Sequence, residues 1–292
     1  MKLFKVFTII LSFLILFIFL FGCTSSQTIV FTDENLEKVI RMYLRKSPED
    51  GIKASELANL ETLLCRDRNI QNISGLEYCI NLTWLSLQRN QITDIPHLSI
   101  LIELNTLYLN DNRINDIYPL SSMVNLNRLY LNNNQISEIS SLASLTELTN
   151  LNIGKNNIYD ISSFSSLTKL TWLAIYENQI SDISPLSTLT KLKTLTIGKN
   201  NIIDIYPLSS LTELTELYIY DNQITDISHL SSLSNLKVLN LSGNKISDIY
   251  PLVDNKYLGA GVTIDLRNNP LSDESINVYM PELQERGINL RY

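Results

Sequence analysis

The residues best able to carry chemistry in this sequence are few and far apart. Histidine occurs only at His97 and His229, which lie six 22-residue periods apart in a chain that repeats with this period. If each period adds one strand spacing, roughly 30 Å separates them, so they cannot share a metal ion or a proton. No nucleophile, base and orienting group stand at a recognisable spacing, and no phosphate-binding glycine loop or Cys/His cluster occurs. The sequence therefore predicts no enzyme, no metal site and no cofactor.

Two cysteines fall at positions that larger apolar residues fill in neighbouring repeats. Cys65 corresponds to Leu87, and Cys79 corresponds to Leu101. A buried thiol behaves as a small apolar side chain, so we expect both cysteines in the core. A disulfide between them and a reactive thiol are the alternatives.

A carboxylate also recurs with the repeat, at Asp94, Asp116, Glu138, Asp160, Asp182, Asp204, Asp226 and Asp248. Calcium sites gather many oxygen ligands within one loop, whereas this column offers one carboxylate per unit. Aspartate commonly accepts hydrogen bonds from nearby backbone in tight turns. We therefore favour a turn-forming role over a calcium ladder.

The period itself is set by asparagine, which recurs every 22 residues at Asn90, Asn112, Asn134, Asn156, Asn178, Asn200, Asn222 and Asn244. Around each, the sequence follows L-x-x-L-x-L-x-x-N-x-I-x-D-I-x-x-L. One such unit cannot enclose its own apolar side chains, but stacked units can. The amide side chain has two donors and an acceptor, so it can satisfy backbone groups where the chain leaves a strand. We expect this asparagine ladder to be structural.

The pattern resembles the 22-residue leucine-rich repeat class of internalins and related bacterial surface proteins. The resemblance implies an α/β solenoid with one parallel sheet on the concave face, an irregular or 3-10 convex side and a helical N-terminal cap. We place this cap at residues 31–59, since FTDENLEKVIRMYLRK followed by SELANLETL resembles the internalin cap. The repeats then cover 60–271. A C-terminal cap covers 272–292, with a helix-like stretch interrupted at Pro281.

The first residues have the layout of an export signal. Two lysines precede an uncharged apolar run from Val6 to Gly22, and the sequence Leu20-Phe21-Gly22-Cys23 resembles the bacterial lipobox. The resemblance implies a lipoprotein signal peptide at 1–22, a lipid on Cys23 and a tether at 23–30. The protein would then face outside the cytoplasm on the cell membrane or outer membrane. An uncleaved 17-residue anchor is the alternative.

The net charge of the chain and the residues on the outward-facing side of the strands indicate which class of partner it binds. The chain has 23 Lys and Arg against 30 Asp and Glu, which disfavours nucleic acid, and we expect a monomer. Outward-facing strand positions vary between repeats, and large aromatic residues gather there although the fold does not require them. Tyr and Trp are common anchors of recognition surfaces. The candidate ligand-binding residues are Trp84, Tyr108, Tyr130, Trp172, Tyr176, Tyr218, Tyr220 and Lys199.

Within this face, one repeat presents only small side chains, Thr194, Thr196 and Gly198, between aromatic neighbours. This predicts a groove whose walls stand about 10 Å apart, two strand spacings. Simple cross-strand packing of the aromatic side chains is the alternative. We interpret the chain as an exported, membrane-anchored protein that binds a protein or peptide ligand on its concave face. Glycan binding, or an envelope spacer without a specific ligand, are the other functions considered.

Overall fold

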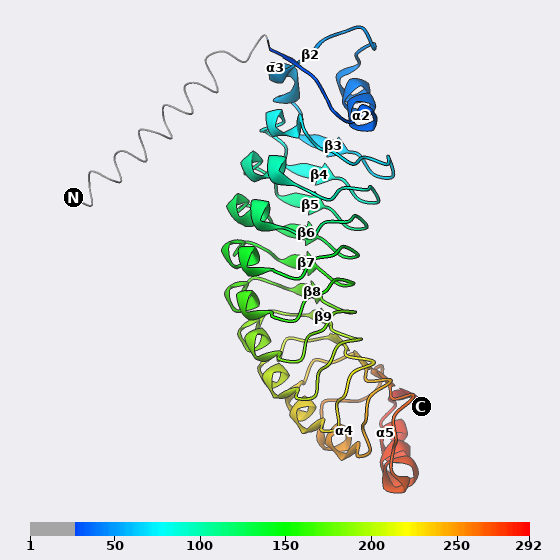
Figure 1. Ribbon diagram of the computed structural model, residues 1–292. Coiled ribbons are helices and arrows are strands. Elements are labelled where there is room, and N and C mark those ends of the chain that lie inside the picture. The colour runs from blue at the N-terminus through cyan, green and yellow to red at the C-terminus, as the bar shows by residue number, and fades with distance from the viewer. Residues whose placement is uncertain (1–26) are drawn as a thin grey trace, which may run out of the picture.

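The computed structural model describes residues 27–292 and shows one curved solenoid. Figure 1 shows the strands stacked along the inner side of the curve and short helical turns along the outer side, with a separate cap at each end. The expected signal peptide and Cys23 lie outside the described residues. Within residues 27–292, no helix has the length and apolar character needed to span a bilayer.

A single parallel sheet of 11 strands runs the length of the solenoid in strict chain order. Its register shifts by one repeat per strand, so that Leu151 pairs with Leu173 and Leu173 with Leu195. The leucine-rich solenoid predicted from the sequence is thereby confirmed. The strands are β3 (Thr62–Leu64), β4 (Trp84–Ser86), β5 (Thr106–Tyr108), β6 (Arg128–Tyr130), β7 (Asn150–Asn152), β8 (Trp172–Ala174), β9 (Thr194–Thr196), β10 (Glu216–Tyr218), β11 (Val238–Asn240), β12 (Thr263–Asp265) and β13 (Asn289–Arg291).

The convex side consists of one short 3-10 helix in each coil. These helices are η1 (Leu76–Tyr78), η2 (Pro96–Ile100), η3 (Tyr118–Ser122), η4 (Ser140–Ser144), η5 (Ser162–Ser166), η6 (Ser184–Thr188), η7 (Tyr206–Ser210) and η8 (Ser228–Ser232), followed by the α-helix α4 (Tyr250–Asp254). Several have proline as the first or second residue, where its fixed φ and missing N–H suit the first turn. The predicted 3-10 convex side is therefore confirmed.

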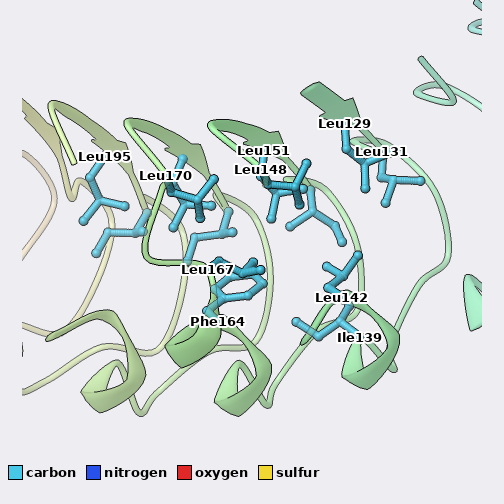
Figure 2. Close-up of a cluster of buried hydrophobic side chains, with 14 of the residues drawn as sticks. Leu129, Leu131, Ile139, Leu142, Leu148, Leu151, Phe164, Leu167, Leu170 and Leu195 are labelled. Atoms are coloured by element: carbon cyan, nitrogen blue, oxygen red, sulfur yellow. The ribbon is translucent and has the colours of Figure 1, made fainter. Parts of the chain in front are cut away.

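The core lies between the sheet and the 3-10 helices and continues through every coil. Figure 2 shows Leu129 and Leu151 from the strands facing Leu142 and Phe164 from the convex side. Phe164 is fully buried and occupies the position that leucine holds in the coils on either side. Because each coil buries its apolar residues against its neighbours, no coil can form its core alone.

The N-terminal cap is helical, as the sequence predicts. Helix α2 (Glu34–Leu44) buries Leu36, Val39 and Ile40, and the short helix α3 (Ala54–Leu57) follows it. Asp33 joins this cap to the first coil. One carboxylate oxygen accepts hydrogen bonds from Leu36 N (3.0 Å) and Asn35 N, while the other accepts from Gln71 N at 2.7 Å and from Asn72 N.

A small two-stranded antiparallel sheet completes the cap and was not expected. Strand β1 (Thr28–Ile29) pairs antiparallel with β2 (Ile52–Lys53), and Ile29 and Phe31 are buried. The folded cap thus begins at Thr28, inside the stretch assigned to the tether, because the two apolar side chains reach the same core as α2.

The C-terminal cap differs from expectation at its proline. A π-helical turn (Ser275–Tyr279, labelled η9) leads directly into α5 (Met280–Glu285), so the helical segment continues through Pro281 instead of breaking there. Pro281 lies in the first turn of α5, where a missing N–H is tolerated. The wider π turn before it accommodates the lost hydrogen bond. Beyond the helix, β13 adds a last strand to the sheet.

Candidate ligand-binding surface

The concave face is held in place by the asparagine side chains beneath the turns that follow the strands. Asn200 donates from Nδ2 to Ile175 O (3.1 Å) and Ile197 O (3.2 Å), and its Oδ1 accepts from Ile180 N at 3.1 Å. Each asparagine thereby joins two coils and fixes the backbone from which the concave side chains project. The same three bonds recur at Asn90, Asn112, Asn134, Asn156, Asn178, Asn222, Asn244 and Asn269.

Four of the candidate residues form a continuous line of rings, which we name the aromatic row: Trp84, Tyr108, Tyr130 and Trp172. The ring centroids of Tyr108 and Tyr130 lie 4.6 Å apart with nearly parallel planes. Trp84 is tilted against Tyr108 at 5.9 Å, and Trp172 against Tyr130 at 6.3 Å. The last contact spans two coils, so these rings lean toward each other over β7. The row is partly exposed to solvent along its length, with Trp84 39% exposed.

Tyr176 and Tyr220 form a second cluster and pack on glycines. A Cβ placed on Gly198 would lie 2.5 Å from Cε1 of Tyr220, and one on Gly154 would lie 2.5 Å from Cε1 of Tyr176. Each tyrosine ring therefore lies against the glycine of the preceding coil, and both glycines are buried. The missing glycine side chain leaves the space that the ring fills.

This packing corrects the predicted groove. Tyr220 covers Gly198 and fills part of the gap of which it was expected to form one wall. Tyr176 leans in the same direction, over Gly154 of its own preceding coil, and therefore away from Gly198. The shape of the concave surface therefore depends on the direction in which the rings lean, and not on the spacing of small residues along the sequence.

The remaining candidates lie beside this second cluster. The Tyr218 hydroxyl donates to Glu216 Oε2 at 3.4 Å, and Lys199 Nζ lies 3.2 Å from Glu177 Oε1 in the neighbouring coil. The hydrogen bond and charge of Glu177 raise the pKa of Lys199. Burial raises the pKa of the Tyr176 and Tyr220 hydroxyls, so both are neutral at physiological pH and can donate hydrogen bonds.

On the convex side, a serine, a histidine and a glutamate are in contact, which their spacing in the sequence did not indicate. Ser74 Oγ lies 3.1 Å from His97 Nε2, and His97 Nδ1 lies 3.2 Å from Glu77 Oε2. This order of groups matches a catalytic triad in outline. It was missed because His97 comes from the next coil, over 20 residues along the chain from Ser74. However, Ser74 N donates to Asn72 Oδ1 and Gly75 N donates to Glu77 Oε2, both at 2.7 Å. Neither N–H is free to stabilise an oxyanion, and we interpret the contact as a link between coils.

The recurring aspartates make hydrogen bonds within their own turns. Asp116 Oδ1 accepts from Tyr118 N at 2.8 Å, and the residue two positions on donates in the same way to Asp160, Asp182, Asp204, Asp226 and Asp248. This is the Asx-turn geometry of such side chains. Among residues 27–292, no three His, Cys, Asp or Glu side chains come together as metal ligands.

Cys65 and Cys79 are both free and fully buried. Burial raises the pKa of each thiol to about 12. Both therefore stay protonated at neutral pH, which disfavours reaction with thiol reagents in the folded protein.

Comparison with known proteins places this geometry among repeat proteins. A family profile described as leucine-rich repeats (2 copies) matches residues 80–122, 102–144, 124–167, 168–210 and 212–254. A comparison with proteins of curated function gave no match.

Solved structures share the fold over most of the chain. Internalin C2 from Listeria monocytogenes is 36% identical, with a TM-score of 0.69, over 71% of this chain and 92% of that chain. The internalin InlF from the same species is 34% identical, with a TM-score of 0.59, over 90% and 92% of the two chains. The ectodomain of the plant receptor kinase GASSHO1/SCHENGEN3 from Arabidopsis thaliana, solved in complex with Casparian strip integrity factor 2, is 25% identical over 72% of this chain and 26% of that chain, with a TM-score of 0.60.

Proposed function

The chain belongs to the leucine-rich repeat family, in its internalin-like form, and we propose that it binds a protein or peptide ligand through the concave face of its sheet. The observation that carries this proposal is the aromatic row. Its rings project from two positions of the repeat that most other coils fill with smaller or charged residues, such as Asn, Thr, Ala and Glu, so the repeat does not require them. They give a partly exposed, largely rigid surface with hydroxyl groups along it, which suits protein recognition.

The orientation of the rings favours a protein or peptide over a glycan. A sugar ring stacks on a free aromatic face, but the faces of Tyr108 and Tyr130 are turned toward each other at 4.6 Å. Their edges and hydroxyl groups are left to contact a ligand. Arg128 is exposed beside them and adds a charged hydrogen-bond donor. A peptide can use these edges, the hydroxyl groups and the guanidinium together.

Affinity capture with a matched pair of variants tests the proposal. The full chain is incubated with extracts of its own envelope, and a captured partner is then titrated. Tyr108→Ala with Tyr130→Ala should weaken binding by at least about 30-fold, as expected when central aromatic anchors are lost. The control, Tyr118→Ala with Tyr206→Ala, removes two exposed tyrosines from the convex side and should leave affinity unchanged. Equal losses in both variants would place the binding surface elsewhere.

We propose further that residues from Cys23 onward are exported and held at a membrane by a lipid on Cys23. The lipobox-like sequence and the apolar run before it support this assignment. Mass spectrometry of the mature N-terminus should find an acylated Cys23, and an intact Met1 would contradict the proposal.

A further inference from the structure

Two positions of the repeat carry apolar residues in the coils nearest the N-terminal cap, whereas later coils carry hydroxyl residues there. Positions are counted from the asparagine of each repeat, which is replaced by Arg68 in the first coil. Tyr78 and Ile100 stand ten residues after this position, and Ile80, Ile102 and Val124 stand twelve residues after it. We name these five residues the apolar strip. In every later coil up to η8 the same positions carry hydroxyl residues: Ser122, Ser144, Ser166, Thr188, Ser210 and Ser232 in the first column, and Thr146, Thr168, Thr190, Thr212 and Ser234 in the second.

Three side chains of the strip are exposed and the other two, Tyr78 and Ile80, are partly buried, although the repeat uses hydroxyl residues at the same positions. Ile100 is 43% exposed, Ile102 47% and Val124 48%. In later coils the first-column hydroxyl donates to a carbonyl of the preceding coil, as Ser144 Oγ does to Ser121 O at 2.7 Å. Ile100 cannot make this bond. An exposed apolar patch in place of a stabilising hydrogen bond indicates an interaction surface.

The path of the chain toward Cys23 starts beside this strip. Residues 27–30 line a shallow pocket of about 280 Å³ together with Tyr78 and the η1 turn, and Val30 is exposed there. Cys23 precedes Gln27 by four residues, which span at most about 14 Å when fully extended. A membrane that holds Cys23 must therefore lie close to Tyr78 and the rest of the apolar strip.

We propose that the apolar strip rests on the surface of the bilayer that holds Cys23, so that the anchored solenoid has a fixed orientation. This inference depends on the proposed lipidation of Cys23. Ile, Val and Tyr side chains gain free energy when they enter the boundary between headgroups and acyl chains. The recurring carboxylates stand at the other end of each 3-10 helix, and the carboxylates next to the strip are Glu77 and Glu103. The strip lies at the ends of the 3-10 helices and in the turns that lead to the next strand, so it is separate from the side chains that project from the concave face.

Depth-dependent fluorescence quenching in vesicles tests the proposal. The full lipoprotein is reconstituted in phosphatidylcholine vesicles that contain a lipid with a nitroxide near the headgroup. A bimane label is placed at Ile102→Cys or, as a matched control four coils away in the same column, at Thr190→Cys. The native Cys65 and Cys79 are fully buried and do not compete for the label. Quenching should be several-fold stronger at residue 102 than at residue 190, and equal quenching would overturn the proposal.

Two further measurements separate the strip from the anchor. Flotation shows whether the protein associates with vesicles at all. If it does not float, the anchoring proposal is wrong and the bilayer contact falls with it; if it floats without quenching at residue 102, only the strip proposal is wrong. In addition, Ile80→Thr with Val124→Thr introduces the residue that the repeat itself uses, so folding should persist while quenching at residue 102 falls several-fold. Unchanged quenching in that background, or shielding of residue 102 only when a soluble envelope protein is added, would contradict a lipid contact.

Discussion

The two sides of a single strand in this protein are under different constraints. On β7, Leu151 points into the core and is matched by leucine in the neighbouring coils, whereas Asn150 and Asn152 point to the concave face and vary from coil to coil. Buried positions must fit coils on both sides, so the repeat restricts them. Concave positions face solvent, and the fold leaves them free. The comparison implies that stability and recognition can be altered separately.

The largest expected effect is at the buried side, at Phe164. Phe164→Ala should lower the free energy of unfolding by about 3–5 kcal/mol, because the cavity cannot close between two packed coils. Urea denaturation measures this change. Phe164→Leu, which restores the residue of the adjacent coils, should cost much less. Affinity of the folded fraction for the concave-face ligand should not change in either variant, and a large affinity loss would break the separation of the two sides.

A smaller but still large loss is expected at the asparagine ladder. Asn200→Ala leaves the N–H of Ile180 buried without the acceptor that it has in the folded protein. It also removes one of the two asparagine donors to Ile175 O and to Ile197 O, which keep their bonds from Asn178 and Asn222. We expect a loss of about 2–4 kcal/mol in the free energy of unfolding, again by urea denaturation. Asn201→Ala is the matched control, because this neighbouring side chain is exposed and should change stability little. Similar losses in both variants would show that the ladder bonds are not what stabilises the stack.

A pH-dependent effect is expected at the N-terminal cap. Burial alone would raise the pKa of Asp33, but hydrogen bonds from Gln71, Leu36, Asn72 and Asn35 outweigh it and lower the pKa below 3.8. The carboxylate therefore stabilises the folded state at neutral pH, and this contribution is lost as pH falls below about 4. Asp33→Ala should cost about 1–2 kcal/mol at pH 7.

The same variant has a distinct signature in acid. The difference in free energy of unfolding between wild type and Asp33→Ala should shrink as pH is lowered from 5 toward 2, measured by urea denaturation at each pH. A difference that stays constant through this range would show that the charge of Asp33 contributes nothing.

The smallest effect on stability is expected on the concave face. Tyr108→Ala removes two ring contacts, with Trp84 and Tyr130, which at this partly exposed site contribute about 0.5 kcal/mol each, the lower end of the range for aromatic pairs, and no buried backbone group loses a partner. Thermal or urea denaturation should show a loss of about 1 kcal/mol, while ligand affinity falls much more. A stability loss as large as that of Phe164→Ala would mean that the aromatic row serves the fold, as the cross-strand packing alternative holds.

The same contrast explains how much the sequence could predict. The stacked coils and their parallel sheet followed from a period that repeats the same constraint many times, whereas the concave position of the sheet and the 3-10 convex side were implied by the resemblance to internalin repeats. The direction in which Tyr220 leans followed from neither, because it depends on Gly198 of another coil and on contacts between side chains. Likewise, the link from His97 to Ser74 joins residues of different coils. The antiparallel pair of β1 and β2 lies in a cap, where no repeat provides a second copy to compare.

The exact 22-residue register of the asparagine bonds also bears on how such a protein can change over generations. Removal of residues 157–178 would leave each remaining asparagine with a carbonyl pair of the same geometry, and the two caps would be untouched. Loss or duplication of one unit through recombination within the gene would therefore shorten or lengthen the concave arc by a whole coil. Such an event would delete or duplicate Trp172 and Tyr176 together, so that ligand preference could change in a single step while the chain still folds.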